Sequence, residues 1–127
     1  MFKKLKYEVT KKASEINDFS YKLEKINNSN YKFFFDQGIF YFNNFLNSTK
    51  VENDYDNLNL SAKYFTKAIE IKKNEAEAYF YLSYIFYFIE ELDLAKNYLK
   101  IAYYLKPDLK GLEELKVNIF NKSIKRF

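Results

Sequence analysis

The side chains that could do chemistry in this chain are a few acidic residues close together in sequence. Asp54 and Asp56 are two positions apart, as in the first part of a calcium-binding loop. The glycine and the final glutamate that complete such a loop are missing. The glutamate pairs at 90–91 and 113–114 are adjacent in sequence, and adjacent side chains on a helix point about 100° apart and cannot form a catalytic dyad. The acidic residues therefore predict no metal site and no catalytic residues.

The chain contains neither histidine nor cysteine. Histidine is the usual acid–base group near neutral pH and the commonest ligand of transition metals. Cysteine would be needed for disulfides, thiolate metal ligands or a thiol nucleophile. No glycine-rich loop that could cradle a phosphate is present either. We therefore expect that the protein is not an enzyme and uses no cofactor.

The basic residues are little evidence for a negatively charged partner such as nucleic acid. The net charge is +4 and the isoelectric point is about 9.0, but Arg126 is the only arginine. Arginine is favoured for phosphate and base recognition, and acidic residues interrupt each run of lysines. Nucleic acid is thus disfavoured as a partner. The alternative of a basic nucleic-acid-associated or membrane-peripheral protein would use basic residues near both ends of the chain. They are Lys3, Lys4, Lys6, Lys11 and Lys12 and, for nucleic acid, also Lys122, Lys125 and Arg126.

The sequence predicts a helical fold, because two glycines and one proline are too few for the turns of an all-β fold. Apolar spacings of three, four and once seven predict an amphipathic helix that ends at the polar residues 27–30. Its apolar residues are Phe2, Leu5, Val9, Ile16, Phe19, Leu23 and Ile26. Five more helices are predicted at about 31–46, 58–72, 75–89, 94–105 and 109–127, the last following Pro107 and capped by Asp108.

An internal repeat organises the middle of the chain. Four pairs of similar or equivalent residues are separated by 34 positions, namely Ser61/Ala95, Phe65/Leu99, Ala68/Ala102 and Lys73/Pro107. The second copy reads Tyr79, Leu82, Ser83, Phe86, Ala95, Leu99, Ala102 and Pro107. This order of aromatic, large apolar and small residues resembles the tetratricopeptide-repeat (TPR) family, in which small residues let paired helices approach closely.

The first copy reads Phe34, Gln37, Gly38, Tyr41, Ser61, Phe65, Ala68 and Lys73. It carries an 11-residue insertion between its helices, near 47–57, and Gln37 and Lys73 depart from the family pattern. The resemblance implies an all-α fold, a superhelical TPR-like stack of about six helices in one domain. The N-terminal helix occupies 1–30, the first repeat 31–74, the second repeat 75–108 and a capping helix 109–127.

The resemblance also implies a concave groove lined by the first helix of each repeat, which binds a peptide or a helix. The residues predicted to line it are Phe35, Ile39, Phe42, Asn43, Phe80, Tyr81, Tyr84, Tyr87 and Phe88. Each aromatic ring buries about 150–250 Å², whereas the largest apolar patch exposed on a typical monomer is about 300–600 Å². The combined area of these rings therefore exceeds that of an ordinary exposed patch. We expect the groove to be covered by the chain's own N-terminal helix, by a second copy in a homo-oligomer, or by an apolar helix or segment of another protein.

The implied function is protein binding, as an adaptor, a chaperone-like holder or an assembly subunit. The aromatic lining lacks the basic residues with which some TPR grooves grip acidic tails, so we expect no such clamp. No stretch approaches the roughly 20 apolar residues that cross a bilayer. The basic N-terminus lacks the apolar segment of a secretion signal. We therefore expect a cytoplasmic protein.

Overall fold

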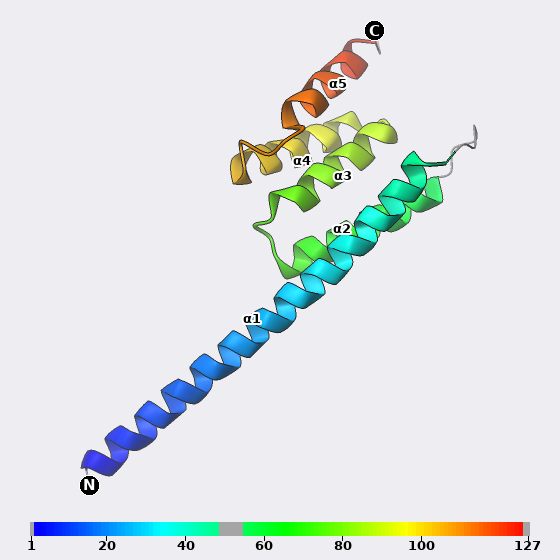
Figure 1. Ribbon diagram of the computed structural model, residues 1–127. Coiled ribbons are helices and arrows are strands. Elements are labelled where there is room, and N and C mark those ends of the chain that lie inside the picture. The colour runs from blue at the N-terminus through cyan, green and yellow to red at the C-terminus, as the bar shows by residue number, and fades with distance from the viewer. Residues whose placement is uncertain (1, 49–54, 126–127) are drawn as a thin grey trace.

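The computed structural model of the protein describes residues 2–48 and 55–125, with side chains from Asp18 onward. In these ranges it contains no strand and five helices: α1 Phe2–Leu46, α2 Tyr55–Ile71, α3 Ala76–Phe88, α4 Leu92–Leu105 and α5 Leu112–Ile124 (Figure 1). The predicted all-α fold is confirmed, whereas the predicted number of six helices was wrong. No helix in the described part of the chain is long and apolar enough to cross a membrane.

The difference in number arises because α1 is one helix where two were predicted. Residues 27–30 are polar, but none is glycine or proline, and such residues cost a helix only tenths of a kcal/mol each. A break would create two new helix ends, each with backbone groups that lack helical partners. Immediately beyond, Tyr31 stacks on Phe35 at 5.8 Å between ring centroids, and Lys32 Nζ lies 2.8 Å from Asp36 Oδ2. The helix therefore runs through the predicted boundary at residues 30 and 31.

The continuous α1 also decides where its N-terminal half lies. Figure 1 shows this half extending away from the other four helices. Phe19, Leu23 and Ile26 are exposed to 66%, 46% and 55%. The possibility that the chain's own N-terminal helix folds back over the aromatic groove was therefore wrong, because there is no turn between the two halves of α1.

The C-terminal half of α1 lies alongside α2 (Figure 1). At the closest approach, Gly38 faces the ring of Phe65, and Ser61 Oγ donates a buried hydrogen bond of 2.7 Å to the Gly38 carbonyl. Glycine is required here because any side chain would enter the space that the ring fills. The helix α2 begins at Tyr55, earlier than predicted, and residues 49–54 of the predicted insertion lie outside the described residues.

The helices α3 and α4 form a second pair, which is joined by a similar hydrogen bond. Ser83 Oγ of α3 donates a buried hydrogen bond of 2.7 Å to the carbonyl of Ala95 in α4. In the repeat alignment Ser83 corresponds to Gly38, and Ala95 corresponds to Ser61. Both pairs thus join the same two positions by a hydroxyl–carbonyl bond, with the donor on α2 in the first pair and on α3 in the second. Each bond satisfies a buried hydroxyl group between the two helices.

The core has two parts, and α3 contributes to both. One lies between α1, α2 and α3 and contains Phe42, Leu58, Phe65, Ala78, Leu82 and Ile85. The other lies between α3, α4 and α5 and contains Tyr79, Ala95, Leu99, Ala102, Leu112, Leu115 and Ile119. Since α3 packs on both sides, its sequence is apolar almost all round, as expected of a buried helix.

The start of α5 differs from the prediction that Asp108 caps the last helix. The structure begins α5 at Leu112, and the preceding Gly111 has a φ of 98°. Only glycine adopts this left-handed conformation without strain. A Cβ atom at Gly111 would also lie 3.0 Å from the ring of Phe80 in α3. The glycine therefore sets the position at which the last helix begins.

Replacing Gly111 with alanine is expected to lower the free energy of unfolding by about 1–2 kcal/mol, the cost of a left-handed backbone for an L-residue. The contact with Phe80 can only add to this cost. Urea unfolding followed by circular dichroism measures the change. The exposed neighbour Lys110, replaced by alanine, serves as the control, and an unchanged midpoint for Gly111→Ala would contradict the account.

Candidate partner-binding face

The rings of α1 and α3 meet around Phe42. Its side chain is 6% exposed. Its ring centroid lies 5.4 Å from that of Tyr81, 6.1 Å from Tyr84 and 6.1 Å from Phe88. Residues 81, 84 and 88 of α3 are spaced by three and four, so they project from one side of the helix. This contact makes α1 and α3 a single aromatic surface, here called the aromatic face.

Tyr84 connects most of the rings of this face. Besides Phe42 it contacts Phe80 at 5.2 Å, Phe88 at 5.9 Å and Tyr87 at 6.4 Å between centroids. The contact with Phe80 is edge-to-face, with an angle of 87° between the rings. Aromatic pairs of this kind contribute about 0.5–1.5 kcal/mol beyond the burial of their area. The rings therefore hold one another in defined positions.

Phe35 anchors the aromatic face to the core beneath it. Its ring lies 5.5 Å from that of Phe65 in α2 and 5.9 Å from that of Tyr81 in α3. Phe65 and Tyr81 are themselves stacked at 5.1 Å. Three helices thus converge on these three rings, so the first helix of each pair is fixed relative to the other.

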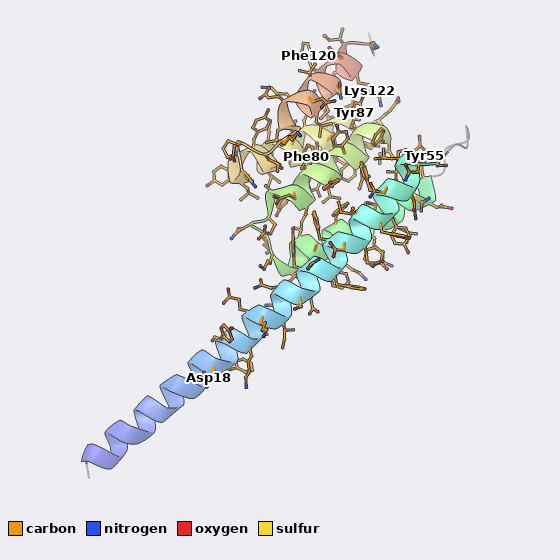
Figure 2. All side chains as sticks on the ribbon, viewed as in Figure 1. Asp18, Tyr55, Phe80, Tyr87, Phe120 and Lys122 are labelled. Atoms are coloured by element: carbon orange, nitrogen blue, oxygen red, sulfur yellow. The ribbon has the colours of Figure 1, made fainter. Side chains whose placement is uncertain are left out.

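At the other side of α3 the aromatic face meets the polar residues of α5. Lys122 Nζ lies 4.1 Å from the centroid of the Tyr87 ring and donates a hydrogen bond of 3.0 Å to the Tyr87 carbonyl (Figure 2). The ammonium group is also 4.0 Å from Glu90 Oε1. A cation over a tyrosine ring is attracted by the charge distribution of the ring. The surface therefore changes from aromatic on α1 and α3 to charged on α5.

Burial perturbs the ionisation of the face's tyrosines. It raises the pKa of Tyr81 above the ordinary 10.0, and Glu77 adds to the effect. It likewise raises the pKa of Tyr84, with smaller effects from Glu114 and Tyr87. Both side chains are consequently neutral phenols at physiological pH and present hydroxyl groups that donate or accept hydrogen bonds.

Raising the pH above about 10 is expected to destabilise the fold. Burial, with the hydrogen bond to Glu113, also raises the pKa of Tyr103 to about 12. These pKa values are higher in the folded than in the unfolded chain. The contribution of the neutral tyrosines to stability is therefore fully present below the unfolded pKa, and it is lost as the pH rises through the folded pKa values. Thermal unfolding between about pH 8 and 12 measures the loss. A melting temperature that stays constant over this range would contradict it.

The structure brings together nearly all the residues predicted to line a groove. Phe42 is buried and Asn43 is exposed. The others are half-buried and pack against the two parts of the core: Phe35, Ile39, Phe80, Tyr81, Tyr84, Tyr87 and Phe88. They come from α1 and α3 and cover one another, and Phe80, Tyr84 and Tyr87 also pack against the part of the core that contains residues of α4 and α5. The aromatic face is therefore partly open to solvent.

One residue of the aromatic face was not predicted from the sequence. Phe45 of α1 contacts Phe88 at 5.2 Å between ring centroids, and it is half-buried. Its position three residues after Phe42 is a helical spacing that could have identified it. The aromatic face is thus extended by this ring toward the end of α1.

A second apolar surface, also missed, lies between α4 and α5. It is a groove of about 800 Å³ with Leu99 and Ile119 in its lining. The exposed Val117 and Phe120 of α5 also line it. These two residues are off the buried stripe of α5, so the pattern that identified the helix did not mark them.

No protein-family model matches the chain, and no curated protein or solved structure is similar to it at a significant level. Its function must therefore be inferred from its own geometry.

Proposed function

We propose that the protein is a TPR-like helical stack that binds another protein. Two features of the helix pairs support the resemblance noted in the sequence. Ala68 and Ala102, which are 34 positions apart, are both fully buried. The hydroxyl–carbonyl bonds of Ser61 and Ser83 join corresponding positions of the two pairs. Paired helices of this kind stack through their neighbours and leave a continuous face for a partner.

The observation that carries the proposal is the partly open aromatic face of α1 and α3. Half-buried rings held in fixed positions lose little conformational entropy on binding, so they are effective anchors. A partner helix or extended segment with spaced apolar side chains would fit between them. Lys122 of α5 lies over the ring of Tyr87, and burial, together with the charge of Glu114 in α5, raises the pKa of Tyr84. These charges would orient the partner.

The role that follows is that of an adaptor, a chaperone-like holder or an assembly subunit in the cytoplasm, without catalytic activity of its own. The proposal rests on a face that can hold an apolar segment, and Asn43 provides a polar contact beside it. A nucleic-acid or membrane-surface role would depend instead on lysines of the N-terminal half of α1. The protein-binding proposal thus places the partner on the aromatic face, whereas the nucleic-acid or membrane alternative places it mainly on the N-terminal half of α1.

Co-purification from native cells, followed by mass spectrometry, tests the proposal with matched variants. Asn43→Arg adds a large charge to the aromatic face at an exposed position, so the fold is expected to persist. Tyr104→Asp introduces a charge on α4, where the side chain is 87% exposed and lies off the face. The wild type and Tyr104→Asp are expected to retain the same partner, and Asn43→Arg is expected to reduce its recovery at least tenfold, a loss of about 1.4 kcal/mol.

Tyr84→Asp provides a second variant at the centre of the face. Circular dichroism first establishes whether it is folded, because Tyr84 also contacts several rings. A folded Tyr84→Asp protein that still binds the partner would contradict the proposal. So would equal binding by Asn43→Arg and the wild type, or recovery of nucleic acid or lipid in place of a protein.

A further inference from the structure

Five of the exposed large apolar side chains of α1 keep a regular spacing along the helix, whereas Tyr21 and Leu46, which are also exposed, lie outside it. The five are separated by four, three, seven and seven residues and are between 46% and 66% exposed. They are Phe19, Leu23, Ile26, Phe33 and Phe40. The residues that contact α2, such as Phe34 and Gly38, lie on another side of the helix. α1 therefore carries an apolar seam in addition to the surface that it buries against its neighbours.

The same spacing continues in the sequence to the beginning of the helix. The apolar residues Phe2, Leu5, Val9 and Ile16 fall on the positions that a seven-residue repeat marks a and d. The repeat thus runs from residue 2 to residue 40, with Lys12, Asn30 and Gln37 as the polar residues at its a and d positions. A straight helix drifts about 20° per heptad relative to such a repeat. Over five heptads, the seam of α1 therefore faces one partner continuously only if the two helices wind around each other. A partner helix meets this condition, whereas a flat membrane surface does not.

We infer that this partner helix is the α1 of a second copy of the chain, in antiparallel orientation. The evidence is the self-complementarity of the seam about Tyr21. In that arrangement Phe19 faces the partner's Leu23, and Ile26 faces the partner's Ile16. Phe33 similarly faces the partner's Val9, so apolar residues meet apolar residues in these layers.

The polar residues of the seam select the orientation. In the antiparallel arrangement Lys12 shares a layer with the partner's Asn30, and Gln37 shares a layer with the partner's Leu5. In a parallel pair Lys12 would instead face the partner's Lys12, and like charges in one layer of a coiled coil repel. A polar residue at a core position of a coiled coil commonly fixes register and orientation. The seam therefore favours the antiparallel pair.

This inference uses a different surface from the aromatic face, so the two can fail separately. The antiparallel pair would place the α2–α5 bodies at opposite ends of the shared α1 helices. Each aromatic face then remains available. Tyr84→Asp, if folded, is expected to leave the dimer intact, whereas a change in the seam is expected to leave partner binding to the aromatic face intact.

Light scattering of the full-length protein tests the association. The wild type is expected to have twice the chain mass of 15.4 kDa. Leu23→Glu places a charge in the central layers and is expected to halve the measured mass without changing the unfolding of the α2–α5 body. Tyr21→Glu is the matched control, because Tyr21 is 68% exposed but lies off the seam. It is expected to remain dimeric.

Disulfide formation tests the orientation, since the natural chain has no cysteine. Phe19→Cys and Leu23→Cys chains are mixed in equal amounts and oxidised, and the products are separated by mass. An antiparallel pair is expected to give mainly the mixed disulfide, because position 19 faces position 23 of the partner. A parallel pair would give mainly the two symmetric disulfides, which would overturn the orientation.

Three further results would overturn the inference. One is a wild-type protein that is monomeric by light scattering. Another is a monomer that sediments with vesicles of anionic lipid through the same residues, which would assign the seam to a lipid surface. A Tyr21→Glu variant that dissociates like Leu23→Glu would show that charge alone, and not the seam, governs association.

Discussion

Replacing Phe65 with alanine is expected to lower the free energy of unfolding by about 3–5 kcal/mol, the usual cost of removing a buried aromatic ring. The Phe65 side chain is fully buried and is among the largest that are. Its ring contacts Phe35 of α1 and Tyr81 of α3, so its loss leaves a cavity at the point where three helices meet. This loss is a large fraction of the stability of a domain of this size.

Urea unfolding followed by circular dichroism measures this loss. Tyr104→Ala is the matched control, because it also removes an aromatic ring but from a site that is 87% exposed. Its effect is expected to stay within about 0.5 kcal/mol. A Phe65→Ala protein as stable as Tyr104→Ala would show that Phe65 does not join these helices.

Replacing Gly38 with alanine is expected to destabilise the protein by about 1–3 kcal/mol, the range for overpacking a core. An ordinary glycine within a helix would give the opposite sign, since alanine is favoured there by about 0.5–1 kcal/mol. Here a Cβ atom would lie 2.7 Å from the ring of Phe65. The hydrogen bond from Ser61 to the Gly38 carbonyl resists any separation of the helices that would relieve the contact.

A double-mutant cycle isolates the cause of that loss. Gly38→Ala is measured in the wild type and in the Phe65→Ala protein, where the ring is absent. If the ring is responsible, Gly38→Ala is expected to become neutral or stabilising in the second background, which gives a coupling free energy of at least about 1 kcal/mol. Equal effects in both backgrounds would contradict the close approach of α1 and α2.

Much of the helical structure could be predicted from the sequence. The helices expected at 58–72, 75–89 and 94–105 correspond to α2, α3 and α4 with shifts of a few residues at their ends. Their buried residues, such as Phe65 and Leu99, follow helical spacing because each helix packs one side against its neighbours. The aromatic residues that gather between α1 and α3 were found by the same reasoning, since their spacing places them on one side of each helix.

Other features depended on interactions that a single segment does not reveal. The polar residues at 27–30 suggested a break, but continuity of α1 is decided by the balance between weak propensities and the cost of two helix ends. Asp108 was a suitable cap in composition, whereas the start of α5 is set by Gly111 and its contact with Phe80. The groove between α4 and α5 exists only once the two helices are placed side by side. Local patterns could not show these three outcomes.

Nuclear magnetic resonance of the tyrosine rings tests the central claim most directly. Tyrosine-labelled protein is titrated with the partner recovered by co-purification, and the Tyr84 and Tyr104 signals are assigned from phenylalanine variants. The account predicts that the Tyr84 ring signal shifts on binding, while the Tyr104 signal, from α4, does not. A partner that binds and shifts Tyr104 but leaves Tyr84 unchanged would contradict the aromatic face as the binding site.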